Sequence, residues 1–573
     1  MERTTLQESG ALKAGQADRV GPTLVGTSTY MAALATTHLA VWLVLSSLWL
    51  AVGGSLNGID IGLALLLAIF LCSWSERGSP AVVSNTIAGV AALLLVWVVA
   101  FVYAMALDDL SYDGQTYHSL AIIKLREGWN PFGGLLLPDD PPLTWLNHYP
   151  KAPWIWAAGI DAVFGNFQAG KAPNVVLAFA AGAAVFSAAS VVTRLPIWAC
   201  FVFGVLAAAN PVASVQMPSF YVDGQLASLL TVMAAGGLMW LRSRSALALL
   251  ITCSAAFCLV NVKFTGLVYA VLLGLAIAAI GVSMRPRRLL ADALPVMACV
   301  MAIAWPGYTP YLNNMMNDDH IFHPVMGKRP IDILSHITPV AFDGQSRWFK
   351  FGRSLASETA NACRNCESGR LKLPFIVRAS EARGATFPDP RMGGFGPLFS
   401  GALLLAAILL AIAVASKAVS AVLPVSLVVL VGLVLINPEA WWARYVPQLW
   451  LVPLTVALFL QNAALPSLGR VVRVALLVVL MANAAFMAVI ATGYAAYSTR
   501  ASRAQVADLA RAGPLYIPDT YWVGALQRLV DGGVVYAKRD FSAADCAEIV
   551  TVLRSNLRVC RPANAAKTTL QAQ

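Results

Sequence analysis

Long apolar stretches separated by short polar segments run along most of the chain. An apolar stretch of about 20 residues is long enough to cross the hydrocarbon core of a bilayer as a helix. The pattern therefore predicts an all-α polytopic membrane protein with about thirteen transmembrane helices. We place the expected spans near residues 31–53, 59–74, 82–107, 173–193, 195–213, 222–241, 246–262, 264–283, 290–306, 397–416, 419–436, 446–461 and 474–496.

The composition agrees with this pattern. Of the 573 residues, 58% are apolar and only 12% are charged, whereas soluble domains carry about 25% charged residues. The net charge of +11 does not indicate nucleic-acid binding, because the sequence has no basic groove with interleaved aromatic residues. Residues 1–30 are polar, carry both signs of charge and do not resemble a cleavable signal peptide. We expect them to form a cytoplasmic tail before a transmembrane domain at 31–496.

The charges of the short loops predict the orientation in the membrane. Cytoplasmic loops are rich in Lys and Arg, and a cytoplasmic N-terminus makes every short inside loop basic. The inside residues are then Arg77, Arg194, Arg242, Arg244, residues 285–288, Lys417, Arg470 and Arg473. This orientation predicts that all large polar segments emerge on the periplasmic face of a bacterial inner membrane. These segments are the loops 108–152 and 307–396, the turns 214–224 and 437–445, and the tail 497–573.

The external segments carry further local signals. The tail 497–573 combines a helical stretch at 500–513, a strand-like stretch at 534–540 and a helix-like stretch at 542–556, which predicts a small periplasmic α/β appendage. Two cysteines of this tail, Cys546 and Cys560, are available to pair. In the loop 307–396, Cys363 and Cys366 form a C-x-x-C pair, for which a disulfide is favoured over free thiols outside the cytoplasm. Residues 387–400 have the Gly and Pro density of a tight turn back into the membrane.

The segment 107–132 carries the residues most suited to chemistry. Asp108, Asp109 and Asp113 stand where an apolar helix leaves the membrane. From Ser119 to Arg126 the apolar spacing predicts an amphipathic helix on the bilayer surface. Asp113 lies four residues before Tyr117, a spacing that places both side chains on one helix face. Asp113 is therefore either a helix cap or a general base that takes a proton from a hydroxyl group.

This segment resembles the GT-C superfamily of membrane glycosyltransferases, in particular its protein-mannosyltransferase-like and aminoarabinose-transferase-like branch. Those enzymes carry an acidic residue, often in a D-x-x-x-Y pattern, in the first large external loop after a span. The matching residues here are Asp113 and Tyr117, followed by His118. Further similar pieces follow in the family's order: NHYPKAPWIWAAG (147–159), SFYVDGQLASLL (219–230), VKFTGLVYA (262–270), WPGYTPYLNNMMNDDHIFHP (305–324) and NPEAWWARYVPQLW (437–450). The family usually has the acidic loop after its first span, whereas two further spans come first here, so the role of residues 1–80 stays open.

The resemblance implies a hexosyl- or pentosyltransferase that takes a sugar from a polyprenyl-phosphate-linked donor. It implies that Asp113 is the catalytic base, which deprotonates an acceptor hydroxyl of a lipid, a glycan or a protein. By the same resemblance, Asp108 and Asp109 are helpers or metal ligands. For His118 and His148, a hydrogen-bonded structural role is an open alternative. The remaining helper and substrate-binding positions are Tyr117, His118, His148, Tyr149, Tyr221, Asp223 and Tyr445.

Lys263 and Arg444 are the candidates for binding the donor phosphate. Each is a lone positive charge beside a span, on the face where the positive-inside bias argues against it. Arg444 stands among Trp441, Trp442 and Tyr445, and its planar guanidinium suits a pair of phosphate oxygens. Snorkelling is the alternative for both cations, and an interfacial aromatic belt is the alternative for the Trp pair.

The sequence leaves the metal and two other functions open. No cofactor is certain from the sequence, and a divalent cation is possible. Asp318, Asp319, His320 and His323 have the composition of a metal site, but their irregular spacing favours a turn-rich acidic loop. A transporter or flippase of lipid-linked sugars would show inverted repeats or charges within its spans, and the sequence shows neither. A ligase that moves a whole glycan would share the same face and cations, but usually relies on external Arg and His.

Overall fold

The computed structural model describes residues 2–139, 141–193, 195–328, 330–333, 337–360 and 369–563, with side chains from residue 23 onward. The expected C-x-x-C disulfide of Cys363 and Cys366 lies outside these residues. All the apolar segments expected as spans are helical. The chain is therefore an all-α polytopic membrane protein with a small C-terminal sheet, as the pattern predicts.

Not every helix is long enough to cross a bilayer alone. Within the described residues, six helical segments are long and apolar enough to span, and a pair bent by 70° at Trp305–Gly307 makes a seventh. The six are Thr23–Ala51 of α1 (Glu2–Ala51), α3 (Val82–Ala106), η2 with α7 (Phe167–Val192), α10 (Asp223–Ser243), α12 (Phe264–Met284) and α21 (Ser467–Arg511). The bent pair joins η3 (Pro286–Arg288) and α13 (Leu289–Ala304) to η4 (Tyr308–Leu312) and α14 (Asn313–Asn317).

The remaining expected spans are apolar helices of 10–17 residues. They are α2 (Ile59–Ser75), α8 (Ile197–Ala208), α11 (Ala246–Val262), α18 (Phe399–Ala415), α19 (Val422–Leu435) and η7 with α20 (Pro447–Phe459). The thirteen expected segments are thus seven that are long enough to cross a bilayer alone and six shorter apolar helices. The short length of α8 has a visible cause: Asn210 accepts a hydrogen bond from the backbone N–H of Val212 and starts a separate short helix, α9 (Pro211–Gln216).

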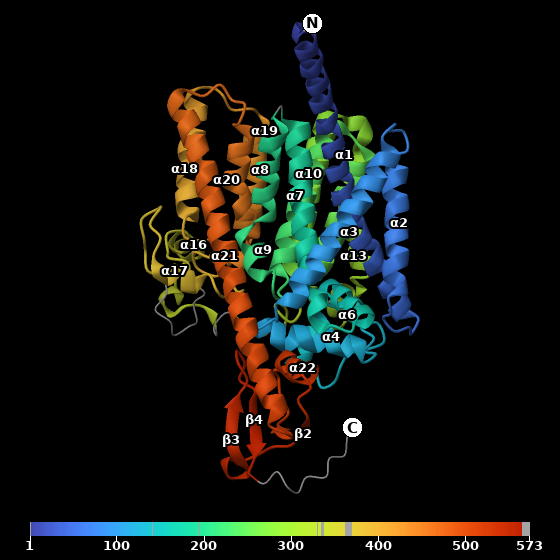
Figure 1. The fold of residues 1–573 in the computed structure, drawn as a ribbon, viewed down its shortest axis with the longest axis vertical. Helices are drawn as coiled ribbons and strands as arrows, with labels where there is room; N and C mark the ends of the chain where they lie inside the picture. The colour runs from blue at the N-terminus through green and yellow to red at the C-terminus, as the bar shows by residue number, and fades with distance from the viewer. Residues whose placement is uncertain are drawn as a thin grey trace.

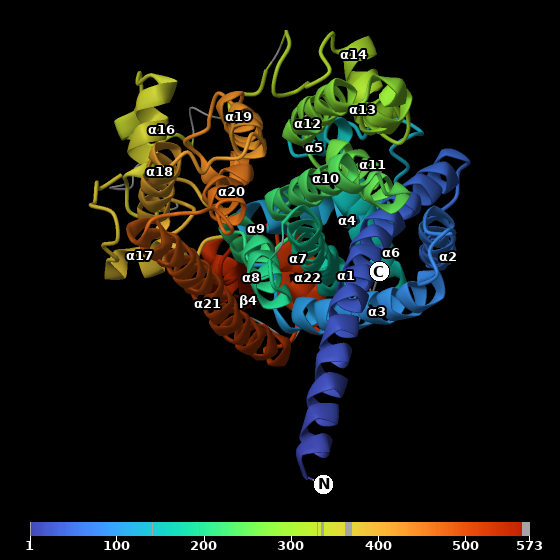
Figure 2. The same cartoon turned by 90° about the horizontal axis from the view of Figure 1, so that it is seen from above.

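The helices run mostly along the long axis of the molecule, and the polar elements gather at one end of it (Figure 1). Viewed from above, α18–α21 form one side of the bundle and α10–α13 the other, with α7–α9 between them (Figure 2). The α1 helix, which continues back to Glu2 instead of starting at the expected residue 31, reaches the opposite end. The short elements of the polar half are η1 (Gly114–His118), α4 (Ser119–Arg126), α5 (Leu143–His148), α6 (Ala152–Phe164), η5 (Val340–Phe342), α16 (Arg347–Leu355), α17 (Ala379–Gly384) and η6 (Ala443–Tyr445).

The last expected span and the helical stretch expected at 500–513 are one continuous helix. The α21 helix does not end at residue 496 but continues to Arg511, directly into a four-stranded sheet of order β2-β1-β4-β3. The elements are β1 (Leu515–Ile517), α22 (Val523–Asp531), β2 (Tyr536–Lys538), η8 (Ala543–Asp545), β3 (Cys546–Thr551) and β4 (Arg558–Pro562). The expected strand at 534–540 is confirmed as β2. The expected helix at 542–556 is wrong, because the β-branched run Ile549–Thr551 pairs antiparallel with β4.

The appendage is fixed in two ways. A Cys546–Cys560 disulfide joins β3 to β4, as the availability of these two cysteines suggested. The α22 helix packs on η1 and α4, so the appendage covers the acidic segment that follows α3. One contact is a hydrogen bond of 3.0 Å from the buried Arg528 Nη1 to the backbone oxygen of Asp109. The sequence-distant tail is therefore part of the wall around the candidate chemistry.

Candidate active site at one end of the bundle

A cavity of about 320 Å³, here named the base cavity, lies where α10, α12 and the segment after α3 meet. Its lining brings together most of the residues that the sequence singled out. Those residues are Asp113, Tyr117, His118, Tyr149, Tyr221, Asp223, Lys263, Arg444 and Tyr445. They come from five segments that are far apart in the chain, so the fold places the predicted candidates on one site.

Asp113 does not act as a helix cap. It precedes η1, but its side chain makes no capping hydrogen bond to that helix. The Asp113 Oδ2 instead accepts a hydrogen bond of 3.3 Å from Arg444 Nη1 across the base cavity. Burial raises the pKa of this carboxyl above its usual range, and the guanidinium of Arg444 opposes that rise. A carboxylate that faces a cavity with a raised pKa suits proton abstraction.

Arg444 lies at the centre of an acidic and aromatic environment. Besides Asp113, its Nη1 lies 3.8 Å from Asp223 Oδ2 and its Nε lies 3.3 Å from Asp389 Oδ1. The guanidinium carbon is 4.7 Å from the centre of the Trp442 ring and 5.1 Å from that of Tyr221. The side chain is only 11% exposed, so Arg444 points into the cavity instead of snorkelling to an interface.

Lys263 occupies the break between α11 and α12, where the backbone is extended with φ −160°. Its Nζ pairs with Asp223 Oδ1 and lies 4.5 Å from the centre of the Tyr445 ring. Burial lowers the pKa of Lys263, whereas the carboxylate of Asp223 opposes this decrease. The ammonium group is thus inside the site and close to the partners of Arg444. Two cations that share one carboxylate could take a phosphate group between them.

Two charged residues of the site were missed by sequence reasoning. Asp389 and Arg391 also line the base cavity, and they come from the segment that was predicted only as a Gly- and Pro-rich turn. Asp389 accepts hydrogen bonds of 2.9 Å from Arg391 Nε and from Trp442 Nε1. The available signal was an Asp and an Arg two residues apart in an external segment. Tyr521 of the appendage lines the cavity too, and no local pattern pointed to it.

His118 is fixed as a neutral side chain. Its Nδ1 accepts a hydrogen bond of 2.7 Å from Trp154 Nε1, so the proton of the neutral ring is on Nε2. Burial lowers the pKa of His118 to about 3. The ring of Tyr117 lies 4.2 Å from it, and Tyr149 meets Tyr117 edge-on at 6.4 Å. These residues form an aromatic wall with one N–H donor.

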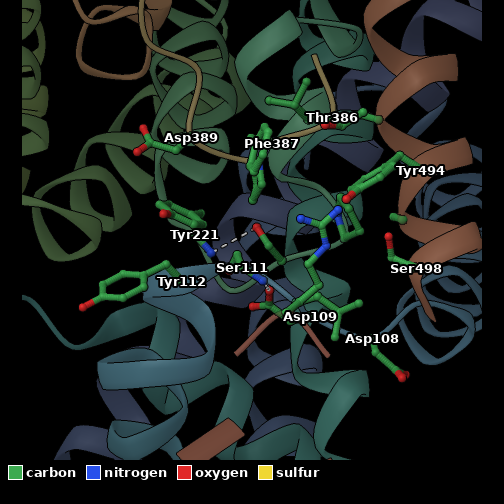
Figure 3. Close-up of a pocket in the computed structure, with 18 of the residues that line it drawn as sticks. Asp108, Asp109, Ser111, Tyr112, Tyr221, Thr386, Phe387, Asp389, Tyr494 and Ser498 are labelled. Atoms are coloured by element: carbon green, nitrogen blue, oxygen red, sulfur yellow. Dashed lines mark hydrogen bonds between the residues drawn. The ribbon is translucent and has the colours of Figure 1, made fainter. Parts of the chain in front are cut away.

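Asp108 and Asp109 lie outside the base cavity, although they were expected as helpers. Asp108 pairs with Arg503 Nη2 of α21 at 2.7 Å. Asp109 accepts hydrogen bonds from the backbone N–H groups of Ser111 at 2.8 Å and Phe220 at 2.7 Å. Both line a neighbouring cavity of about 450 Å³, here named the appendage cavity (Figure 3). Their contacts hold the segment after α3 against the bundle and do not reach the reacting groups.

His148 also lies away from the base cavity. Its Nε2 lies 2.9 Å from Asp139 Oδ2 and its Nδ1 lies 2.8 Å from Asn314 Oδ1, and both oxygens are hydrogen-bond acceptors. The ligand atoms of His148, Asp318 and His323 lie within 4.8 Å of one another, a geometry that could hold a divalent cation. Of the acidic loop considered for a metal, Asp319 pairs with Lys328 instead. Sequence spacing missed this group because His148 is far from the loop in the chain.

An apolar groove of about 120 Å³ lies deeper in the bundle. Its lining includes side chains between Thr231 and Leu241 of α10, between Leu273 and Ile280 of α12, and along α20 from Leu451 to Phe459. The same stretches of chain carry Asp223, Lys263 and Arg444 at their other ends. With a rise of 1.5 Å per residue, Thr231 is about 12 Å along α10 from Asp223. Charged groups therefore stand at one end of the helices that form the groove.

Comparison with known proteins gives a distant structural likeness. No family model and no curated protein matches the chain. A crystal structure of ArnT from Cupriavidus metallidurans bound to undecaprenyl phosphate is similar over 83% of this chain and 97% of that chain, with 17% identity and a TM-score of 0.38. The apo state of the same protein is similar over 82% and 96%, with 16% identity and a TM-score of 0.36. Because likeness at this level does not establish a shared activity, the function of this chain follows from its own residues.

Proposed function

We propose that this protein is a GT-C-type membrane glycosyltransferase that transfers a sugar from a polyprenyl-phosphate donor to an acceptor hydroxyl. The observation that carries the proposal is the placement of Asp113, Lys263 and Arg444 in one cavity. A base next to two cations is the set of groups that such a transfer requires. One group removes the acceptor proton, and the others stabilise charge on the departing phosphate.

The contacts of Arg444 suggest how the donor prepares the base. Arg444 Nη1 is 3.3 Å from Asp113 Oδ2. A donor phosphate between Lys263 and Arg444 competes with the carboxylates for these cations. Asp113 then loses part of its pairing and is free to bind the acceptor hydroxyl. A phosphate therefore both brings the sugar and releases the base.

The transfer itself is a single displacement at the anomeric carbon. The acceptor oxygen gives its proton to Asp113 and forms a bond to that carbon. The bond from the carbon to the phosphate oxygen breaks, and the phosphate leaves with the electron pair. Configuration is inverted, and Lys263 and Arg444 balance the added negative charge. His118, with its Nε2–H, is placed to donate a hydrogen bond to a sugar oxygen.

The apolar groove fits the lipid part of the donor. A polyprenyl chain is apolar, so it can pack between α10, α12 and α20 by van der Waals contact in place of membrane lipid. The phosphate end of that chain would reach the cations at the ends of the same elements. This arrangement favours a membrane-bound donor over a soluble nucleotide sugar.

The proposed orientation has the base cavity on the periplasmic face of a bacterial inner membrane and the N-terminus in the cytoplasm. The basic short loops support it. The Cys546–Cys560 disulfide supports it independently, because disulfides persist mainly in oxidising compartments. A transporter would instead hold its charges near the membrane midplane. Here the charged group lies at one end of the helices.

The test uses isolated membranes supplied with polyprenyl-phosphate sugars. We expect Asp113→Asn to lower sugar transfer about 10³-fold, whereas Asp540→Asn, a matched change at an exposed position of the appendage, leaves it unchanged. Undiminished transfer by Asp113→Asn contradicts the assignment of the base. Mass spectrometry of envelope glycans with and without the gene identifies the sugar and the acceptor. Unchanged glycans in a strain that lacks the protein contradict the proposed function itself.

A further inference from the structure

The appendage cavity has no role in the steps described so far. It adjoins the base cavity, and the two share Tyr112, Tyr221, Asp389 and Arg391 in their linings. A molecule in one cavity therefore reaches the wall of the other. With about 450 Å³ the appendage cavity is the larger of the two, and pockets of 300–1,000 Å³ are the usual size for small-molecule sites.

The appendage cavity is lined by aromatic rings together with charged side chains, and its three aspartates, Asp108, Asp109 and Asp389, are each already paired or hydrogen-bonded. Tyr221, Phe387 and Tyr494 lie around it in Figure 3, and Tyr112 and Trp522 are its other aromatic residues. Tyr112 and Trp522 meet edge-on with ring centres 5.3 Å apart. The C–H faces of sugar rings pack well against such rings, while hydroxyl groups bind the few polar side chains between them. The lining suits a saccharide.

One cation of this cavity has no acidic partner. Arg391 is paired with Asp389 at 2.8 Å, whereas Arg554 forms no ion pair with any residue that the structure describes. The Arg554 guanidinium lies 5.0 Å from the centre of the Tyr494 ring and 6.0 Å from that of Phe387. Its side chain is exposed to the cavity and its mouth. A cation in this setting attracts an anionic group.

The backbone holds Arg554 in place. Arg554 lies in the turn between β3 and β4 with φ +59°, a conformation that costs free energy for a residue other than Gly. Its backbone oxygen accepts a hydrogen bond of 2.8 Å from Gln115 Nε2, two residues after Asp113. The turn is thus joined to the same segment that carries the base. An anion held by Arg554 would be positioned relative to Asp113.

We propose that the appendage cavity is the acceptor site, and that the acceptor is a saccharide with an anionic group, a carboxylate or a phosphate, held by Arg554. This inference rests on the proposed function. The sugar ring packs on the aromatic wall, and the acceptor hydroxyl passes the shared residues Tyr112 and Tyr221 to reach Asp113. The appendage therefore selects the acceptor, while the helix bundle binds the donor.

The experiment measures binding to the full-length protein in nanodiscs and does not depend on turnover. The probes are glucose, glucuronate and glucose 6-phosphate, observed by saturation-transfer NMR at millimolar concentrations, and undecaprenyl phosphate, observed by native mass spectrometry. We expect at least one anionic sugar to bind about 10-fold more tightly than glucose. The tighter of the two identifies the anionic group as a carboxylate or a phosphate.

Two variants give the test its control. Arg554→Gln should reduce the affinity for the anionic sugar to that for glucose, and Arg554→Lys should restore most of it. Arg558→Gln, at an exposed position of β4 outside both cavities, should change nothing. Equal binding of all three sugars, no binding of the anionic sugars, or unchanged binding by Arg554→Gln overturns the acceptor site. If the protein binds the anionic sugar but does not bind undecaprenyl phosphate, the result contradicts the proposed donor and supports the acceptor site.

Discussion

Asp109 and Asp113 belong to the same short segment, yet their surroundings differ. Burial raises the pKa of both carboxyl groups. Asp109 accepts hydrogen bonds from the backbone N–H groups of Ser111 and Phe220, which are fixed parts of the fold. Asp113 is paired with the side chain of Arg444, and a phosphate can compete for this side-chain contact. The comparison teaches that a perturbed carboxyl is a candidate base only where its partners can be exchanged.

The largest effect expected from this difference is on turnover by Asp113→Asn. The amide cannot accept the acceptor proton, so the transfer rate should fall by about 10³-fold. The melting temperature in detergent should stay near that of the wild type, because Asp113 makes no capping hydrogen bond to η1. Transfer assays and thermal unfolding of the same preparations measure both quantities. A large fall in melting temperature would place Asp113 with Asp109 as a structural residue.

Arg444→Gln should produce the next largest effect, a loss of about 10²-fold in kcat/KM for the donor. The variant also has a pH signature. A general base works when it is deprotonated, so the rate falls as pH decreases through the pKa of Asp113. The guanidinium lowers that pKa, and its removal raises it. The acid limb of the pH profile should therefore move to higher pH.

The control for the pH signature is Arg444→Lys, which keeps the charge. Its acid limb should stay close to that of the wild type, although the loss of the planar guanidinium weakens donor binding. The measurement is a pH profile of the transfer rate over the acid range for the wild type and both variants. An acid limb that is the same in wild type and Arg444→Gln contradicts the pairing of Arg444 with the base.

Asp109→Asn should act mainly on stability. The substitution replaces one acceptor oxygen with an amide group that cannot accept from a backbone N–H. Leaving such a buried donor unpaired costs about 1–3 kcal/mol. Thermal unfolding should report this loss, whereas turnover per folded molecule should change only a few-fold. An activity loss as large as that of Asp113→Asn, without loss of stability, would assign chemistry to Asp109.

The sequence predicted the helices well because apolar length is a local property. The amphipathic helix Ser119–Arg126 has the predicted bounds. The last expected span and the helical stretch expected at 500–513 form one continuous helix, α21, because no Gly or Pro lies between them. The helix expected at 542–556 failed because pairing with β4 overrides local helix propensity.

The site was predictable where a residue was unusual for its position. Lys263 and Arg444 stood out as isolated external cations, and both line the base cavity. Asp389 could not be singled out, because its role depends on Trp442 and Arg444, which are distant in the chain. His148 illustrates the opposite error: its neighbour Tyr149 lines the base cavity, while its own ring turns toward Asp318 and His323. Side-chain direction at a helix end cannot be read from spacing alone.

The smallest predicted effect tests whether His118 is a neutral hydrogen-bond donor or a group that titrates beside Asp113. With a pKa of about 3, His118 stays neutral between pH 5 and 8. His118→Asn should reduce transfer by less than about 10-fold, by the same factor throughout this pH range. Trp154→Phe removes the hydrogen bond to Nδ1 that keeps the His118 proton on Nε2. It should cause a similar loss of transfer if the Nε2–H donates a hydrogen bond to the sugar. A step in the wild-type pH profile near 6.5 that disappears in His118→Asn would show that His118 titrates, and would move part of the proton transfer from Asp113 to this ring.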